Sequence, residues 1–230
     1  MKAVILAGGY GKRLRPLTDS VPKALLQIAG KAIIEWQIEW LRSHDISEII
    51  MCVGYLKEKI IESISSGQRL NVKVGYVVED EPLGTAGALK NAEHLLRTER
   101  SFIVINGDVL TNINPTSLTE LLNNYIGAVA VVPLPSPYGI IKYDMNEYRI
   151  IEFKEKPIIE EYWINAGVYA FSSEVFKYLP LKGELEFTTF PQLSSKGLLR
   201  AVPFKGKYWK SIDSQKDLEE ADAYFRSSTK

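Results

Sequence analysis

The sequence predicts an α/β fold: a Rossmann-like, doubly wound and mostly parallel mixed sheet in a single domain. Short apolar runs alternate with helical patterns through the first half, which is typical of β-α-β units around a parallel sheet. A length of 230 residues and an apolar fraction of 46% are enough for one large core. A glycine-rich loop also follows the first apolar run directly, as expected where a sheet of this kind binds a ligand.

Each element of the first half has its own pattern. The apolar run at residues 2–6 predicts a buried strand, and a long glycine-containing loop follows it to about Gly30. Apolar residues recur at helical spacing over residues 31–43, which predicts an amphipathic helix. By the same criteria we expect strands at 48–53, 72–78 and 101–105, and helices at 57–65 and 84–96.

The second half has fewer helices and predicts a mixed-sheet extension folded onto the same domain. Strands are expected at 128–132, 139–143, 150–155 and 164–171, followed by helices near 173–179 and 190–196. Strands at 199–203 and 208–212 and a closing helix complete the chain, and Ser214 is the expected N-cap of that helix.

Composition excludes several classes of function. Lys plus Arg and Asp plus Glu both total 28, so no overall field attracts nucleic acid or an anionic membrane. Cys52 is the single cysteine and lies in an apolar run, which indicates a core residue in a reducing compartment. The N-terminal segment does not resemble a signal peptide, and no apolar run approaches the ~20 residues that span a bilayer. We therefore expect a cytoplasmic protein.

The glycine-rich loop is the strongest candidate for ligand binding. It comprises Leu6, Ala7, Gly8, Gly9, Tyr10, Gly11, Lys12 and Arg13. Glycines let backbone N–H groups approach phosphate oxygens closely, and the guanidinium of Arg13 suits bidentate phosphate contact. Lys23 presents a second cation from the same loop. The alternative interpretation is a tight turn with solvated basic residues. Neither a P-loop ending nor a complete dinucleotide-binding pattern is present.

A second polar segment follows the fourth predicted strand. Asn106-Gly107-Asp108 comes at the carboxyl end of that strand, as the glycine-rich loop does for the first. Ligands of open α/β sheets bind beyond these ends, so we expect Asp108 to lie near the loop. Alternatively, Asp108 only caps the loop after its strand.

The loop and several later motifs together resemble the sugar-1-phosphate nucleotidyltransferases. The later motifs occur in order along nearly the whole chain: Pro82-Leu83-Gly84-Thr85-Ala86-Gly87, Asn106-Gly107-Asp108, Tyr138-Gly139, Glu155-Lys156-Pro157 and Asn165-Ala166-Gly167. The chain most resembles the mannose-1-phosphate and heptose-1-phosphate guanylyltransferase branches. The resemblance implies a nucleotide-diphospho-sugar transferase fold over residues 1–230. Many relatives add a C-terminal left-handed β-helix, which we do not expect here.

The resemblance also implies a reaction and roles for the residues. A sugar phosphate oxygen attacks the α-phosphorus of a nucleoside triphosphate, and pyrophosphate leaves without a covalent enzyme intermediate. Arg13 and Lys23 would hold the triphosphate, and Asp108 would ligate Mg²⁺. Lys156 would neutralise the sugar phosphate. Glu155, Asn165 and the Gly139 backbone would contact the sugar. The nucleotide site would comprise Leu6, Ala7, Gly8, Gly9, Gly11, Lys12, Glu79, Gly84 and Thr85.

Three of these residues have plain structural alternatives. Glu155 and Lys156 would make a solvated charge pair at a strand end, and Asn165 would satisfy backbone groups within the sheet.

One position departs from the family pattern. Relatives place a second metal-binding aspartate two residues after a C-terminal tryptophan, where this chain has Ser211 after Trp209. A hydroxyl is a much weaker Mg²⁺ ligand than a carboxylate. We favour Asp213 as the substitute, because alternate residues of an extended segment face the same side. The other two interpretations are an ion held by Asp108 and the nucleotide alone, or a protein without catalysis. Lys210 is a further cation that could compete for phosphate.

The identity of the nucleotide base and of the acceptor sugar is predicted less directly than the type of reaction. Aligned on Gly84, Glu79 replaces the glutamine common in thymidylyl and uridylyl relatives. A carboxylate accepts hydrogen bonds from both donors of guanine, so we expect GTP. The resemblance to the mannose-1-phosphate branch implies mannose-1-phosphate as the acceptor. The first alternative is a UTP- or dTTP-dependent enzyme acting on glucose-1-phosphate or an N-acetylhexosamine-1-phosphate.

Other functions stay open at this point. A non-catalytic sugar-nucleotide-binding regulatory subunit is suggested by Ser211. Cytidylyl transfer to an alcohol phosphate is opposed by the sugar-handling motifs, and a glycosyltransferase by the absence of an Asp-x-Asp motif in the sequence. Because relatives commonly form dimers or tetramers, we expect a homo-oligomer and no nucleic-acid or membrane partner.

Overall fold

A seven-stranded sheet forms the centre of the molecule. The computed structural model describes residues 1–228, and its sheet has the strand order β12-β8-β11-β6-β1-β4-β5. Strand β1 pairs in parallel with β4 on one side and with β6 on the other, and β11 runs antiparallel to β6 and β8. The prediction of a doubly wound, mostly parallel mixed sheet is confirmed. Its strands are β1 (Lys2–Ala7), β4 (Glu48–Val53), β5 (Lys73–Val78), β6 (Ser101–Asn106), β8 (Gly127–Pro135), β11 (Ile158–Ser172) and β12 (Leu199–Pro203).

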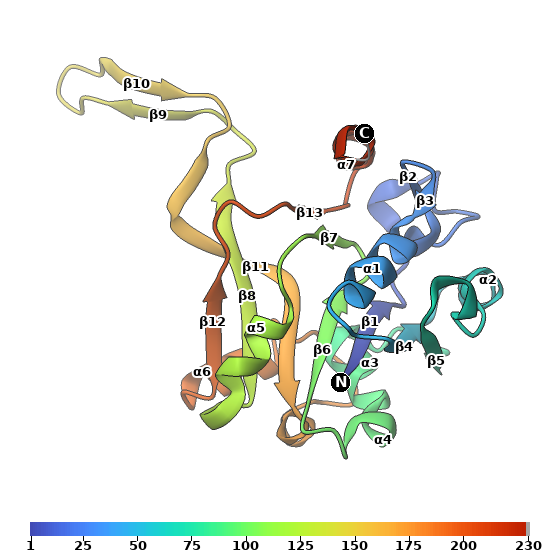
Figure 1. Ribbon diagram of the computed structural model, residues 1–230. Coiled ribbons are helices and arrows are strands. Elements are labelled where there is room, and N and C mark those ends of the chain that lie inside the picture. Colours follow the sequence, from blue (N-terminus) through green and yellow to red (C-terminus); the bar gives the residue numbers. More distant parts are fainter. Residues whose placement is uncertain (229–230) are drawn as a thin grey trace.

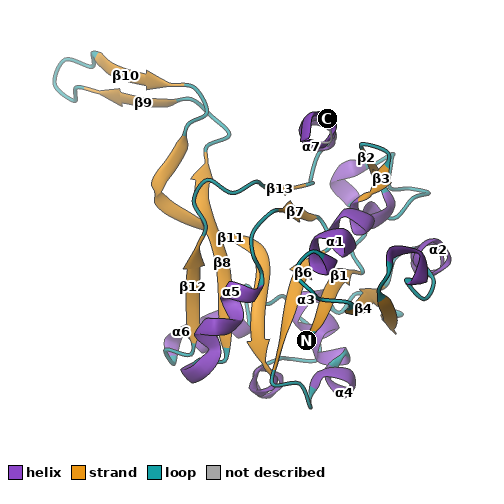
Figure 2. Cartoon of the chain, in the orientation of Figure 1, coloured by secondary structure: helices purple, strands orange, loops and turns teal. Residues whose placement is uncertain are grey.

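Helices cover both faces of this sheet (Figure 2). Residues of β1 alternate between the two sides: Ala3 and Ile5 pack with the cluster that includes α1, whereas Val4 packs with the cluster that includes α3. This alternation explains why the strand reads as a continuous apolar run. The helices are α1 (Ile33–Arg42), α2 (Lys57–Ile64), α3 (Gly84–Asn91), α4 (Glu93–Leu96), α5 (Thr116–Thr119), α6 (Thr189–Ser195) and α7 (Gln215–Ser228). Within residues 1–228, none of the helices has both the length and the apolar content needed to cross a bilayer.

Several predicted boundaries in the first half are wrong for local reasons. The first helix begins at Ile33 because residues 31–32 pair as β3 with β2 in a short hairpin. The helix predicted at 84–96 is interrupted at Ala92, which separates α3 from α4. The predicted loop before Gly30 contains two short 3-10 helices. The small elements are η1 (Lys12–Leu14), η2 (Lys23–Leu25), β2 (Gln27–Ile28), β3 (Lys31–Ala32), η3 (Gln68–Leu70), η4 (Glu120–Asn124) and η5 (Ser173–Lys177).

Two short strands that lie beside the sheet complete the carboxyl end. Strand β7 (Val109–Thr111) was not predicted, and it pairs antiparallel with β13 (Trp209–Ser211). The backbone N–H of Ile212 donates to the Asp108 carbonyl over 2.9 Å, so the pairing brings the end of the chain to Asp108. Helix α7 then begins as expected, because the Asp217 N–H donates to Ser214 Oγ over 3.3 Å.

A separate ribbon projects from the sheet. Strands β9 (Ile140–Tyr143) and β10 (Ile150–Lys154) pair only with each other among the described residues, and they extend beyond the ends of β8 and β11 (Figure 1). We call residues 136–157 the arm. The two strands were predicted, as part of a mixed-sheet extension folded onto the same domain. They lie outside the seven-stranded sheet because β8 pairs directly with β11, and the arm is the connection between them.

Candidate active site

A cavity of about 340 Å³ opens at the carboxyl ends of β1 and β6. The order of strands reverses at this point, since β4 and β6 flank β1. Open α/β sheets bind ligands at such a reversal. The Gly107 N–H donates to the Leu6 carbonyl over 2.9 Å, so the two loops are joined at the floor of the cavity.

Most of the predicted nucleotide-binding residues line this cavity. Those that do so are Leu6, Ala7, Gly8, Gly9, Lys23, Glu79, Gly84, Thr85 and Asp108. Gly11 is the N-cap of η1 with a φ of 61°, while Lys12 and Arg13 lie within η1, outside the cavity lining. Lys12 Nζ lies 5.5 Å from the ring centre of Tyr10, which does line the cavity. The loop therefore presents its backbone to the cavity and its cations to the rim.

The charged centre of the site is a cluster of two carboxylates around one amine. Lys23 Nζ donates to Asp108 Oδ2 over 2.7 Å and to Asp213 Oδ1 over 2.9 Å. Arg13 also donates to Asp213 Oδ1, over 2.8 Å. Four predicted residues, from the first loop, the middle and the C-terminal part of the chain, thus meet at one point.

Asp213 is held in place by its neighbours. Ser211 Oγ donates to Asp213 Oδ2 over 2.9 Å, so the two side chains face the same side, as expected. Partial burial raises the pKa of the Asp213 carboxyl, but hydrogen bonds and charge from Lys23, with Ser211 and Arg13, lower it further than burial raises it. The pKa lies below its ordinary value, and Asp213 is ionised at neutral pH.

The donor set around Asp108 and Asp213 fits a hard cation. Within residues 1–228, no group of three or more His, Cys, Asp or Glu side chains is arranged to hold a metal ion. Two converging carboxylates remain, which is the usual protein contribution to a Mg²⁺ site completed by substrate phosphates. Lys210 does not compete there, because its amine contacts Asp217 over 2.7 Å and Glu220 over 2.6 Å.

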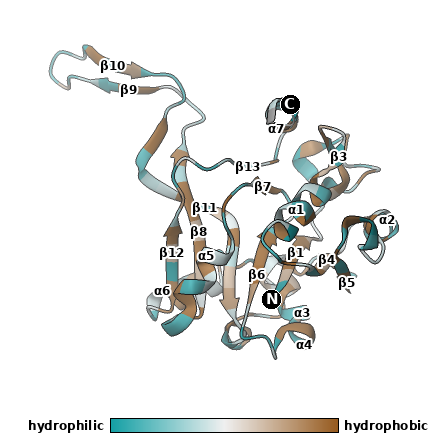
Figure 3. Ribbon diagram, in the orientation of Figure 1, coloured by the Kyte–Doolittle hydropathy of each residue, from teal (hydrophilic) through white to brown (hydrophobic). Residues whose placement is uncertain are grey.

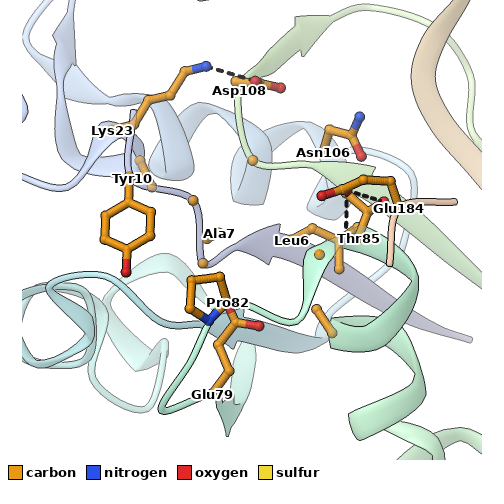
Figure 4. A pocket seen from close by; sticks show the side chains of 16 residues that line it. Leu6, Ala7, Tyr10, Lys23, Glu79, Pro82, Thr85, Asn106, Asp108 and Glu184 are labelled. Atoms are coloured by element: carbon orange, nitrogen blue, oxygen red, sulfur yellow. Dashed lines mark hydrogen bonds and ion pairs between the residues drawn. The ribbon is translucent and has the colours of Figure 1, made fainter. Parts of the chain in front are cut away.

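The far end of the cavity carries a half-buried carboxylate. Figure 4 shows Lys23 and Asp108 at one end and Glu79 with Pro82 at the other. Glu79 lies so close to Gly8 that any side chain at that glycine would collide with its carboxylate. Burial raises the pKa of Glu79, the Leu83 N–H opposes this, and the charge of Glu184 adds to it.

Sequence reasoning missed part of the lining. Glu184 accepts hydrogen bonds from both the N–H and the hydroxyl of Thr85, each over 2.9 Å, across 99 residues of sequence. No local pattern signals such a contact. Asn106 belongs to the Asn106-Gly107-Asp108 motif, so its position in the cavity lining could have been inferred from that of Asp108. The lining residues that were given no role in the sequence analysis are Tyr10, Ala24, Pro82, Ala88, Asn106, Gly107 and Glu184.

The predicted sugar-phosphate residues are not brought to the cavity. Lys156 and Glu155 lie at the base of the arm, 52% and 62% exposed, with their charged atoms 3.6 Å apart. A Cβ at Gly139 would come within 2.9 Å of Glu155 Oε2, so Gly139 belongs to the same group. In this structure Glu155 and Lys156 make the solvated pair that was the alternative interpretation.

Asn165 lies elsewhere, on β11. Its amide donates to the Tyr169 hydroxyl over 2.8 Å, and its oxygen accepts from the Gly167 N–H over 2.9 Å. The backbone role that sequence analysis left open is therefore observed.

Comparison with known proteins places these features in one family. The chain matches the family described as nucleotidyl transferase over residues 2–228. It is 35% identical to a mannose-1-phosphate guanyltransferase of Yarrowia lipolytica over 99% of this chain and 65% of that protein. It is 36% identical to the mannose-1-phosphate guanylyltransferase catalytic subunit beta of Danio rerio, over 94% of this chain and 62% of that one. The chain thus spans less than two thirds of the length of these curated relatives.

Solved structures agree. HddC from Yersinia pseudotuberculosis complexed with GMP-PN superposes with a TM-score of 0.78 at 29% identity. The match covers 97% of this chain and 99% of that one.

Proposed function

This chain belongs to the nucleotidyl transferase family, and on that premise we propose that it transfers a guanylyl group from GTP to mannose-1-phosphate, releasing pyrophosphate. The observation that carries the proposal is the Lys23–Asp108–Asp213 cluster beside the glycine-rich loop, with distances of 2.7 and 2.9 Å. Such a cluster supplies both a cation for phosphate and oxygen donors for a metal. The match over residues 2–228 supports a single nucleotidyltransferase domain across residues 1–230.

The reaction requires charge neutralisation and alignment more than a nucleophilic side chain. The sugar phosphate oxygen forms a bond to the α-phosphorus, and the bond to pyrophosphate breaks. Lys23 and Arg13 stabilise the triphosphate, and the loop amides orient it for in-line attack. Asp108 and Asp213 would hold Mg²⁺, which supplies charge stabilisation at the phosphates. Lys156 would neutralise the sugar phosphate, while Glu155, Asn165 and Gly139 would contact the sugar.

The base preference rests on Glu79. Its carboxylate lies at the end of the cavity opposite Lys23, where a base extends when its phosphates contact Lys23 (Figure 4). A carboxylate accepts the N1–H and N2–H of guanine together, whereas pyrimidine bases flank one donor with acceptors. The names of the guanylyl-transferring relatives support the same choice. We also assign the enzyme to the cytoplasm, which the single buried thiol of Cys52 favours.

A substrate panel tests this proposal. The four nucleoside triphosphates are each combined with mannose-, glucose- and N-acetylglucosamine-1-phosphate in Mg²⁺, and pyrophosphate is measured. We expect GTP with mannose-1-phosphate to give the highest kcat/KM. A higher value for UTP or dTTP would reject the assignment of the base. Tight nucleotide binding without pyrophosphate from any pair would indicate a non-catalytic binding protein.

The role of Asp213 has its own test. We expect Asp213→Ala to abolish turnover while nucleotide binding in chelator survives, because Asp108 and the loop remain. Ser211→Asp is the matched variant, since it restores the position that relatives use. Unchanged turnover in Asp213→Ala would remove Asp213 from the metal site. A large increase in Ser211→Asp would show that the natural site is weakened.

A further inference from the structure

Two parts of the cavity wall are held in different ways. One part follows the strands β1 and β6, which are largely apolar (Figure 3) and include fully buried residues such as Ile5 and Val104. The other part consists of residues 79–85, which connect β5 to the start of α3, together with Glu184. Pro82 and Glu184 are exposed, so burial of apolar surface holds this part only weakly. Hydrogen bonds therefore have to fix it.

Backbone contacts join this part of the wall to a segment that is distant in sequence. The Gly183 N–H donates to the Leu83 carbonyl over 2.8 Å. The Gly183 carbonyl in turn accepts from the N–H groups of Ala86 and Gly87, over 2.9 and 3.3 Å. A Cβ at Gly84 would come within 2.5 Å of the same carbonyl oxygen, so a side chain there would force the two segments apart. We call residues 83–87 and 183–185 the junction.

Within the junction, Glu184 occupies the amino end of helix α3. The first N–H groups of a helix have no acceptor inside the helix and favour negative charge. Glu184 Oε2 accepts hydrogen bonds from the N–H and the hydroxyl of Thr85, each over 2.9 Å (Figure 4). The Leu185 N–H donates to the same hydroxyl over 2.8 Å, so this hydroxyl is engaged both as a donor and as an acceptor. Thr85 thus connects the two segments in addition to lining the cavity.

The junction also reaches the carboxylate that is proposed to read the base. The backbone N–H of Glu79 donates to the Val53 carbonyl over 2.9 Å, which fixes its main chain to the end of β4. The Glu79 carboxylate accepts from the Leu83 N–H over 3.3 Å, and Leu83 is itself held by Gly183. The direction of the Glu79 carboxylate therefore depends on where the junction places Leu83.

From these contacts we propose that Glu184 is a positioning residue for recognition of the base. By holding Thr85 at the start of α3 it fixes Leu83, which directs Glu79 toward the guanine base. Loss of the contact between Thr85 and Glu184 should weaken GTP binding about 10-fold, because a hydrogen bond to a charged group is lost and Glu79 is no longer directed. The inference rests on the proposed function for the identity of the base, whereas the holding of the loop by Glu184 does not.

Hydrogen exchange tests the holding of the loop in the free chain. Thr85→Val keeps the shape of the side chain and removes the hydroxyl, Thr85→Ser keeps the hydroxyl, and Glu184→Ala removes the acceptor. The amides of residues 83–87 are expected to exchange about 10-fold faster in Thr85→Val and Glu184→Ala, and within about twofold of wild type in Thr85→Ser. Thr119→Val is the control and should show wild-type exchange, because its hydroxyl donates to the Thr116 carbonyl in α5, outside the cavity lining. Wild-type exchange in either Thr85→Val or Glu184→Ala would overturn the inference.

Calorimetry with GTP and inosine triphosphate (ITP) tests the direction of Glu79. The base of ITP lacks the N2 amine of guanine, so a carboxylate that reads both donors should favour GTP by about 10-fold. This preference should fall to about twofold in Thr85→Val and Glu184→Ala and persist in Thr85→Ser, an effect that general destabilisation would not give. A full preference in Thr85→Val would reject the role of Glu184 in recognising the base. If the wild type itself does not distinguish the two nucleotides, the base assigned in the proposed function fails, while hydrogen exchange still decides whether Glu184 holds the loop.

Discussion

The cavity and the arm hold their polar residues in opposite ways. Lys23 is largely buried, and Asp213, one of the two carboxylates around it, is fixed by a second contact, from Ser211 over 2.9 Å. On the arm, Lys156 has a single adjacent partner, Glu155, and both are mostly exposed. The cavity is therefore built by contacts between distant parts of the chain, whereas Lys156 and Glu155 have only each other as ion-pair partners among residues 1–228.

This difference separates two kinds of residue that serve the same proposed reaction. Side chains in the loops after β1 and β6 are held by the buried strands that precede them. This favours precise alignment of the phosphates. The charged groups at the base of the arm lack such support, because Lys156 and Glu155 are both mostly exposed. Variants of residues in the two regions test this difference.

Asp108→Ala should have the largest effect on activity. Loss of a metal-binding carboxylate is expected to lower kcat by about 10⁴-fold, or more than 5 kcal/mol of transition-state stabilisation. Pyrophosphate release measures the loss, and circular dichroism should show an intact fold. Activity within tenfold of wild type would mean that the metal is not held at Asp108.

Phe171→Ala should have the largest effect on stability. Phe171 is fully buried on β11, so its truncation is expected to lower the free energy of unfolding by about 3–5 kcal/mol. Phe153→Ala is the matched variant on the arm, and in dilute solution, where chains are separate, it should change that free energy by less than about 0.5 kcal/mol. Urea denaturation measures both. Equal losses would show that the arm packs against its own chain.

Lys156→Ala should act on one substrate only. We expect its KM for the sugar phosphate to rise by about 100-fold, because a charge-assisted hydrogen bond to phosphate is lost. The affinity for GTP, measured by calorimetry, should be unchanged. Lys23→Ala provides the contrast, since it should weaken GTP binding itself. A weakened GTP affinity in Lys156→Ala would place Lys156 at the triphosphate.

Glu79 should make GTP binding sensitive to acid. Burial raises the pKa of its carboxyl above 4.5, so on acidification Glu79 takes up a proton at a higher pH than an exposed glutamate does. The carboxylate of Glu79 binds a proton more tightly in the folded chain than in the unfolded chain. Acidification therefore weakens guanine binding, but protonation of this group does not destabilise the fold. Affinity should fall by about 10-fold or less. Calorimetry across pH tests this, and Glu79→Gln should remove the pH dependence.

The main sheet could be predicted because its signals are local. The strand at residues 48–53 was predicted with its observed bounds, since a buried parallel strand is a continuous apolar run between turn residues. The three residues of β7 are too short for any period to appear. Strand pairing in the arm could not be predicted. Alternation of apolar and polar residues predicts a strand, but it does not specify which strand pairs with which.

The site could be predicted where it depends on loops after strands, and not where it depends on distant contacts. Asp108 and Lys23 were placed together because parallel strands bring their carboxyl ends to one edge. The contact of Glu184 with Thr85 depends on tertiary packing and has no counterpart in the local sequence. Lys156 was expected at the cavity on the resemblance, and it lies at the base of the exposed arm, because a motif reports the residues of a site and not their positions in space.

Gln37 shows how firmly the turn before Asp108 is fixed. Its buried amide nitrogen donates to the carbonyls of Asn106 and Val109 over 2.9 and 2.8 Å, clamping the turn from helix α1 at both ends. Its own carbonyl oxygen has no hydrogen-bond partner among residues 1–228, a loss of about 1–3 kcal/mol. The turn that carries Asp108 is therefore held by two hydrogen bonds and accompanied by one unpaired buried oxygen. Gln37→Leu should lower the melting temperature, because it removes that oxygen but leaves the Asn106 and Val109 carbonyls without their donor, and it should reduce turnover by loosening the turn.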